Sequence, residues 1–245
     1  MISPSGRYVI AYNGEIYNHI EFRNELRAFD PSLSFRGASD TETLLSAIET
    51  WSVEKTLKRC NGMFAFALWD KVERRLCLAR DRMGEKPLYV GWINGGIIFS
   101  SELKPILNVY PLAIEHHAVE LMLGLGYVPS PWSIARHVFK LPPASYLWLD
   151  EKDTKSVPDK EGFISFLRPY WSLAQVASEG VAANGRSAVS SPDDAACELE
   201  RLLKDAIRLR MLSDVPLGAC LSGGVDSASI AALMQSLSNK PIKTF

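Results

Sequence analysis

The sequence predicts a sandwich of antiparallel sheets with flanking helices over residues 1–150, followed by the start of a parallel α/β domain at 193–245. Short β-branched and aromatic runs separated by turn signals fill the first hundred residues, which favours antiparallel strands. Near the C-terminus, a glycine loop lies between an apolar run and a helical pattern, in the order of a βα unit. The stretch 151–192 is charged and then rich in small residues, so we expect a linker or surface excursion.

Composition excludes several classes of protein. An apolar content of 47% over 245 residues is sufficient for a buried core and excludes a disordered chain. Lys and Arg number 27 and Asp and Glu 28, so no cationic excess is available to bind nucleic acid or acidic membranes. The sequence has no run of about 18 apolar residues, so we expect no membrane-spanning helix. Four cysteines without close pairing fit a reducing, cytoplasmic setting.

The N-terminal elements follow from residue patterning. RYVIAYN from Arg7 predicts a strand that ends before a turn at Gly14, and the segment from Tyr17 has helical spacing of apolar residues. A second amphipathic helix begins near TETLLSAIETW, with Ser39 or Asp40 as its N-cap. The sequence thus predicts strand, turn, helix, helix.

Two hairpins are predicted next. Met63 to Asp70 and Arg75 to Arg80 are apolar runs around a polar turn, and Asn94-Gly95 is a strong hairpin dipeptide between two further runs. Within this region we expect Arg80 and Asp81 to form a buried or interfacial ion pair with Lys86 nearby. Short helices at 101–107 and 116–125, a strand at 144–150 and a long helix capped by Ser191 complete the expected elements.

The loop Ser222-Gly223-Gly224-Val225-Asp226-Ser227 follows the apolar run Pro216–Leu221 and precedes a helical segment. Glycines let successive N–H groups approach an anion, and the helix start adds partial positive charge. No Walker spacing is present. Asp226 would repel phosphate unless a divalent cation lay between them, which favours Mg²⁺. The alternative is a glycine turn that only caps a helix. Cys220, in the predicted strand, is expected to be buried.

The segment SDVPLGACLSGGVDS resembles the pyrophosphate loop of the asparagine synthetase-type ATP pyrophosphatases, enzymes that adenylate a carboxylate and release pyrophosphate. The resemblance implies that ATP and Mg²⁺ are required and that Asp226 takes part in magnesium binding. It also implies that Leu221, Ser222, Gly223, Gly224, Val225, Asp226 and Ser227 contact ATP.

The first 150 residues resemble the glutaminase domain of the same family. The shared landmarks are Asn13 to Asn18, Ser39-Asp40, GMFAFALWD from Gly62, and ARDRMGEKPLY from Ala79. The resemblance implies an N-terminal cysteine nucleophile whose own α-amine acts as base. It assigns Asn13 and Gly14 as oxyanion donors, and Glu15 and Asp40 as ligands of the glutamine α-amino group. Amides donate hydrogen bonds and carboxylates suit an ammonium, so the division is chemically sound.

The sequence departs from this family at its first residue. Residue 1 is Met, residue 2 is Ile, and the first cysteine, Cys60, lies in a segment predicted to be core. We therefore expect a chain that is incomplete at the N-terminus, lacks most of the synthetase domain, and does not itself hydrolyse glutamine.

The resemblance implies an asparagine synthase: a carbon–nitrogen ligase that amidates aspartate through an acyl adenylate, with ammonia from glutamine. Its partners would be glutamine, aspartate and ATP, with no nucleic acid and no membrane, and a homodimer is left open. Two alternatives remain. One is a β-lactam synthetase-like or other relative that has lost its glutaminase site, and the other is a truncated, non-catalytic binding protein.

Overall fold

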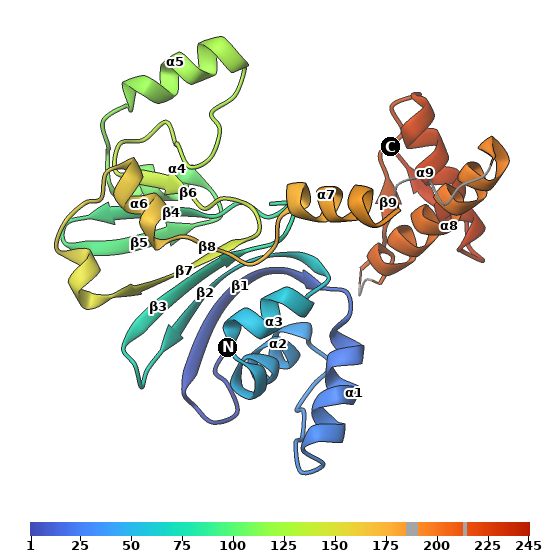
Figure 1. Cartoon of the computed structure of the whole chain (residues 1–245), viewed down its shortest axis with the longest axis horizontal. Helices are drawn as coiled ribbons and strands as arrows, with labels where there is room; N and C mark the ends of the chain where they lie inside the picture. Colours follow the sequence, from blue (N-terminus) through green and yellow to red (C-terminus); the bar gives the residue numbers. More distant parts are fainter. Residues whose placement is uncertain (185–190, 213–214) are drawn as a thin grey trace. The chain divides into compact units, whose positions relative to one another are not determined.

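Two antiparallel sheets pack face to face in the first of the two units of this chain. The computed structural model describes residues 1–184, 191–212 and 215–245, and the units are Met1–Leu173 and Ala174–Phe245 (Figure 1). The first sheet has the strand order β1-β2-β3-β7-β8 and the second β5-β4-β6. The first sheet comprises β1 (Tyr8–Ile16), β2 (Gly62–Asp70), β3 (Arg75–Arg80), β7 (Ser145–Asp150) and β8 (Arg168–Pro169).

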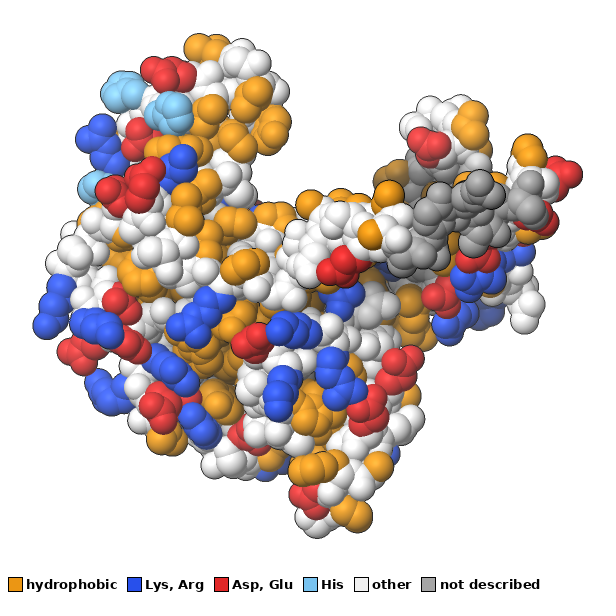
Figure 2. All heavy atoms as spheres, viewed as in Figure 1, with side chains coloured by type: hydrophobic (Ala, Val, Ile, Leu, Met, Phe, Trp, Pro, Cys, Tyr) orange, Lys and Arg blue, Asp and Glu red, His pale blue; other side chains and the backbone are white. Residues whose placement is uncertain are grey.

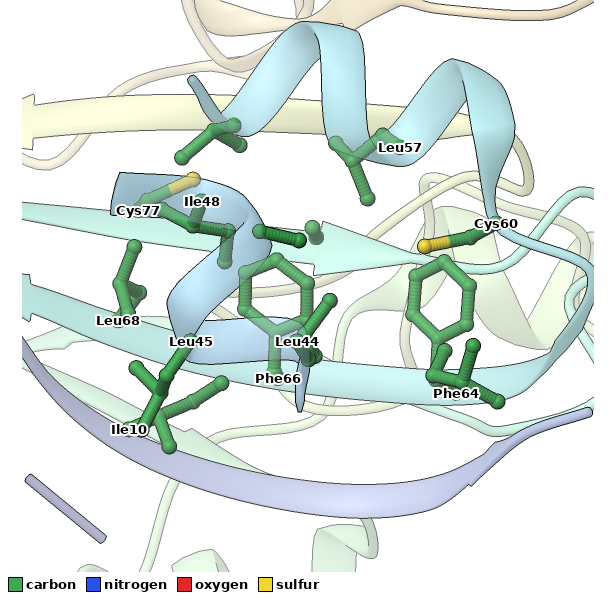
Figure 3. Packing of buried hydrophobic residues seen from close by; sticks show 14 of the residues in the cluster. Ile10, Leu44, Leu45, Ile48, Leu57, Cys60, Phe64, Phe66, Leu68 and Cys77 are labelled. Atoms are coloured by element: carbon green, nitrogen blue, oxygen red, sulfur yellow. The ribbon is translucent and has the colours of Figure 1, made fainter. Parts of the chain in front are cut away.

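Both faces of the first sheet are apolar. Along β2, large apolar residues on one face alternate with alanines on the other. Phe64, Phe66 and Leu68 point to one face and pack against the helices, while Ala65 and Ala67 point to the second sheet. The helices on that face are α1 (His19–Phe29), α2 (Asp40–Trp51) and α3 (Val53–Arg59). Figure 3 shows phenylalanines of β2 meeting leucines of α2 and α3 in this core. Small residues between the sheets allow their close approach.

The second sheet is built on the predicted hairpin. Strands β4 (Tyr89–Ile93) and β5 (Gly96–Ser100) are joined by Asn94 and Gly95, whose φ angles of 52° and 73° match a tight hairpin turn. The sheet is completed by β6 (Val138–Lys140), and its hydrophobic cluster includes Ile106 of α4 (Leu103–Val109). Helix α5 (His116–Leu125) follows. The predicted sandwich of antiparallel sheets with flanking helices is confirmed.

Arg80 and Asp81 do not form the expected ion pair but instead anchor the backbone. The Arg80 guanidinium donates to the carbonyls of Lys86, Gly84 and Leu141, each at 2.7 Å. The buried Asp81 carboxylate accepts four backbone N–H groups at 2.9 to 3.2 Å. Asp81 is buried and Arg80 half-buried beside a tight turn, where peptide groups are the nearest partners. Their role is to fix the 80–86 segment.

The first half of the stretch 151–192, expected to be a linker or surface excursion, is instead folded as part of the first unit. A 3-10 helix (Glu151–Thr154), α6 (Lys160–Phe166) and β8 all belong to the first unit. Phe163 is fully buried and stacks on Phe139 with ring centroids 4.5 Å apart. One apolar face on a short helix is too weak a pattern to stand out in a charged segment. Helix α7 (Leu173–Asn184) follows, and the rest of the stretch up to 190 lies outside the described residues.

The second unit contains helix α8 and, after it, a strand–helix–strand segment whose two strands are parallel. Helix α8 (Pro192–Arg210) begins at Ser191, whose hydroxyl accepts the Asp194 N–H as predicted. Strands β9 (Gly218–Ala219) and β10 (Lys243–Thr244) are parallel and flank α9 (Val225–Ser236) in sequence, which confirms the start of a parallel α/β domain.

Burial in the second unit is thin. β9 is shorter than the predicted run, and Cys220 is exposed rather than buried. The prediction for Cys220 was wrong because burial along this strand ends one residue earlier. Ala219, at 8% exposure, packs in a small hydrophobic cluster with Ile207 and Met234. Val225 is 82% exposed at the start of α9.

Candidate functional site

Asn13, Gly14 and Glu15 all lie inside β1, so the strand continues through the turn that was predicted at Gly14. They pair with Ala65, Phe64 and Met63 of β2 in antiparallel register. The strand continues because Gly14 allows a close approach of backbone: a Cβ here would lie 2.2 Å from the Met63 carbonyl oxygen. An Asn-Gly dipeptide is typical of hairpin turns, which is why the sequence alone predicts a turn at Gly14. Here the glycine serves strand contact instead.

The Gly14 N–H points away from β2. Its partner Phe64 directs both backbone groups to the other side: its N–H donates to Asp81 Oδ2 at 3.2 Å, and its carbonyl accepts the Asp81 N–H at 2.8 Å. Gly14 and Phe64 are therefore a non-hydrogen-bonded pair of the ladder. The Gly14 N–H is thus directed to the outer edge of the sheet, where β1 is the last strand.

Residues of the same parity along β1 behave in the same way. The Ile10 N–H donates outward to the Met1 carbonyl at 2.9 Å, and the Ile16 N–H donates outward to Asp40 Oδ2 at 2.9 Å. Gly14 lies between these two donors. The outer edge of β1 therefore presents the Gly14 N–H as a main-chain donor. It lies two residues before Ile16, whose N–H binds the Asp40 carboxylate.

Asp40 holds α2 against the end of β1. Its Oδ2 atom accepts the Tyr12 hydroxyl at 2.8 Å as well as the Ile16 N–H. Ser39, the predicted N-cap, accepts the Thr41 N–H at 3.2 Å, so α2 begins at Asp40. Burial, together with the Asp40 carboxylate, raises the pKa of Tyr12, which keeps the phenol a donor. Asp40 thus lies at the same edge as the Gly14 N–H.

Asn13 faces the second sheet. Its Nδ2 donates to Ser101 Oγ at 3.1 Å, and both residues line a pocket of about 200 Å³ between β1 and β5. Strand alternation places Glu15 on the same face as Asn13, opposite Tyr12 and Ile16. Ser101 was not a predicted site residue, because nothing in the local sequence distinguishes it from a turn serine. The structure thus brings all four predicted residues, Asn13, Gly14, Glu15 and Asp40, to one end of β1.

Cys60 is no substitute for a catalytic thiol. It is a free cysteine with 1% exposure between α3 and β2, and burial raises its pKa to about 12. A nucleophile must be a thiolate within reach of its substrate. Cys60 is therefore a core residue, as the sequence predicted.

The predicted phosphate loop, Ser222 to Ser227, leads into the first turn of α9 in the second unit. Gly223 has a φ of 83°, which favours glycine, and a Cβ there would meet no atom within 4 Å. Ser222 Oγ and Ser227 Oγ lie 3.1 Å apart, and Ser227 Oγ also donates to the Gly224 carbonyl at 3.1 Å. The loop is thus closed by its two serines and open to solvent on its glycine side.

The donor set at this loop suits magnesium only in the presence of a phosphate ligand. Asp226 is exposed in the first turn of α9. Across residues 1–184, 191–212 and 215–245, no three His, Cys, Asp or Glu side chains gather in a way that could hold a metal ion. Mg²⁺ commonly binds through one or two carboxylates plus substrate phosphates. One carboxylate beside an open anion loop fits that mode.

Comparison with known proteins places the chain in a family. A family model described as a glutamine amidotransferase domain matches residues 1–162. The chain belongs to this glutamine amidotransferase family. A second model, asparagine synthase, matches residues 198–245, so the family resemblance predicted from the sequence is confirmed. None of the helices in the described ranges is long and apolar enough to cross a membrane.

Several relatives are similar over most of this glutamine amidotransferase chain. A putative asparagine synthetase [glutamine-hydrolyzing] 2 of Methanocaldococcus jannaschii is 34% identical over 93% of the chain and 40% of the relative. Asparagine synthetase [glutamine-hydrolyzing] 1 of Bacillus subtilis is 34% identical over 97% of the chain and 34% of the relative. The chain spans about a third to two fifths of the length of these relatives.

Among solved structures, the chain is similar to glutamine phosphoribosylpyrophosphate amidotransferase from B. subtilis. The TM-score is 0.42 at 16% sequence identity, over 100% of this chain and 47% of the other.

Proposed function

We propose that this chain is part of a glutamine-dependent asparagine synthase, a carbon–nitrogen ligase. In the proposed reaction, an aspartate carboxylate oxygen attacks the α-phosphorus of ATP and pyrophosphate leaves. Ammonia released from glutamine then attacks the acyl carbon of the adenylate, and AMP leaves. The two matched families and the names of the relatives support this combination of activities.

The observation that carries the glutamine half of the proposal is the outward Gly14 N–H beside Asn13 and Asp40. A developing oxyanion needs fixed donors at the position where charge appears, and a strand N–H and an anchored amide supply two. Carboxylates at the same end of β1, Glu15 and Asp40, offer acceptors for the α-ammonium of glutamine. We assign the donors to the amide oxygen and the carboxylates to the ammonium.

For the ATP half, Leu221 to Ser227 would surround the phosphates and Asp226 would hold Mg²⁺. The supporting geometry is the left-handed Gly223, the open glycine side of the loop and the start of α9. The magnesium ion would offset the charge that gathers on the phosphates. We place the protein in the cytoplasm, since Cys60, Cys77, Cys197 and Cys220 are all free.

Binding of glutamine to the present chain tests the first half without requiring turnover. Titration of L-glutamine is compared with titration of glutaramate, which lacks the α-amino group. We expect glutamine to bind about tenfold more tightly, because a charged hydrogen bond contributes about 1.5–3 kcal/mol. Asp40→Asn should reduce this preference, because Glu15 is then the one proposed carboxylate left for the ammonium, and Asp30→Asn, which changes an exposed carboxylate at the end of α1, should leave the preference unchanged.

Equal affinity for the two compounds, or a preference that is unchanged in Asp40→Asn, would contradict the assignment of the ammonium site. Thermal denaturation of each variant checks that the fold is retained, since Asp40 also binds Tyr12.

A further inference from the structure

A second pocket, of about 480 Å³, lies in the first unit between the start of α5, β6 and the segment before α6. It shares no lining residue with the Asn13 pocket. Its volume falls within the range of small-molecule sites, roughly 300–1,000 Å³. The residues that matter here are Trp132, Arg136, Val138, Phe139, Asp159 and Lys160.

One part of this pocket is apolar and aromatic. Val138 and Phe139 of β6 contribute to the lining although they are only 2% and 6% exposed. Trp132 is held in place by His117, whose ring meets the indole edge-on with centroids 4.8 Å apart. A flat apolar group bound here would gain dispersion and stacking contacts. Phe139 packs on Phe163 in the core, so the half-buried Trp132 indole is the main aromatic surface of this lining that a ligand can reach.

The other part of the pocket carries cations. Lys160 Nζ lies 5.6 Å from the centroid of the Trp132 ring. The Arg136 side chain is exposed, and within the described ranges its guanidinium makes no hydrogen bond or ion pair. An unpaired guanidinium at the mouth of a pocket is a strong ligand for carboxylate or phosphate.

The two carboxylates in the lining are already engaged by backbone N–H groups. Glu115 accepts the His117 N–H at 3.4 Å, and Asp159 accepts the Gly162 N–H at 2.8 Å. Each carboxylate keeps its charge, and the contacts hold it at a helix start, where the partial positive charge of the helix stabilises it. The lining therefore carries two carboxylates already placed at helix starts and two cations, of which the Arg136 guanidinium has no hydrogen-bond or ion-pair partner within the described ranges.

We propose that this pocket binds a small anion with a flat apolar body. The ring would lie against Trp132, and the anionic group would face Arg136 and Lys160. Aryl carboxylates and nucleoside phosphates both have this chemistry. The site is separate from the proposed glutamine and ATP sites and does not depend on either.

Titration of the full chain with phenyl phosphate tests the proposal. We expect binding that is at least about tenfold tighter than that of phenol or inorganic phosphate, each of which lacks one half of the chemistry. Arg136→Gln and Lys160→Gln should each weaken binding about tenfold. Lys155→Gln is the matched control, an exposed lysine of the same segment that is absent from the lining, and should change nothing.

Competition identifies the source of the ligand. Displacement of phenyl phosphate by benzoate assigns an aryl carboxylate, and displacement by AMP that persists in Asp226→Asn assigns a nucleoside phosphate. Binding of phenyl phosphate that is unchanged in both Arg136→Gln and Lys160→Gln would overturn the proposal. So would equal binding of the phenethylammonium cation, which has the ring but the opposite charge, because it would place the recognition on the carboxylates of the lining.

Discussion

The side-chain amide of Asn13 donates a hydrogen bond to Ser101 Oγ at 3.1 Å and so joins β1 of the first sheet to the residue after β5 of the second. The contact orients the amide with its nitrogen toward the second sheet, which is the orientation of a donor. Because Gly14 directs its N–H to the outer edge of the same strand, two donors of different kinds emerge from consecutive residues.

Asn13→Asp should separate folding from glutamine binding. A carboxylate can accept from the Ser101 hydroxyl where the amide donated, so we expect a change in unfolding free energy within about 1 kcal/mol. The proposed donor for the glutamine amide oxygen is lost, so affinity for glutamine should fall about tenfold by calorimetric titration. Ser101→Ala keeps the donor and should bind glutamine within a few-fold of the original chain. Loss of affinity in Ser101→Ala alone would argue against Asn13 as the donor.

Gly14→Ala should be strongly destabilising. The new Cβ would lie 2.2 Å from the Met63 carbonyl oxygen and 2.6 Å from the Phe64 Cα, so β1 and β2 must separate. We expect a loss of about 3 kcal/mol, at the upper end for overpacking, measured by chemical denaturation. Gly96→Ala is the matched control in β5, since its nearest neighbour would be 3.6 Å away. Equal stability of the two variants would refute the close contact.

The four thiols should fall into two classes. Cys197 and Cys220 are exposed, whereas Cys60 and Cys77 are buried and burial raises the pKa of each thiol, that of Cys60 to about 12. Iodoacetamide at pH 8 followed by peptide mapping should therefore label two sites in the native chain and four in denaturant. Rapid labelling of Cys60 under native conditions would show that the α3–β2 core is open.

The Arg7–Asp70 pair should make stability depend on pH. Arg7 donates to both oxygens of the buried Asp70 carboxylate, at 3.0 and 2.7 Å. Burial alone would raise the pKa of Asp70, but Arg7 and the backbone N–H groups of Val72 and Glu73 outweigh it, so the pKa is lowered.

A lowered pKa contributes stability above the unfolded value of about 3.9 and loses it as pH falls through the folded value. We expect Asp70→Asn to cost about 2 kcal/mol at pH 7, with the difference shrinking below about pH 4. Glu73→Gln, at 4.0 Å from Arg7 and exposed, should cost less than about 0.5 kcal/mol. A deficit for Asp70→Asn that stays constant down to pH 2 would be inconsistent with this account.

Much of the fold was predictable because local rules agree with the tertiary structure. The Asn94-Gly95 turn, the Ser39 and Ser191 caps and the α5 segment 116–125 all appear as predicted. Each of these features is specified by residues close to it in the sequence. The first half of 151–192 was harder to predict because Phe163 acquires its role only through contact with Phe139, which is distant in sequence.

The candidate site could likewise be predicted from the sequence only in part. Asn13, Gly14, Glu15 and Asp40 could be named from the sequence, but only through resemblance to a family. The outward direction of the Gly14 N–H depends on register with Phe64, and the Ser101 contact depends on packing of two sheets. Neither leaves a local pattern. Cys220 was misplaced for the related reason that burial of a strand depends on neighbours outside it.

The decisive measurement concerns the loop before α9, because ATP use is what distinguishes a ligase from a glutaminase alone. The amide resonances of Gly223 and Gly224 are followed by NMR during titration with ATP and Mg²⁺. We expect both to shift saturably, and Asp226→Asn to weaken binding about tenfold in the presence of Mg²⁺. Asp193→Asn, also a first-turn carboxylate, in α8, should have no effect. Unshifted glycine amides, or equal ATP affinity in the two variants, would contradict the assignment of this chain to an ATP-dependent ligase.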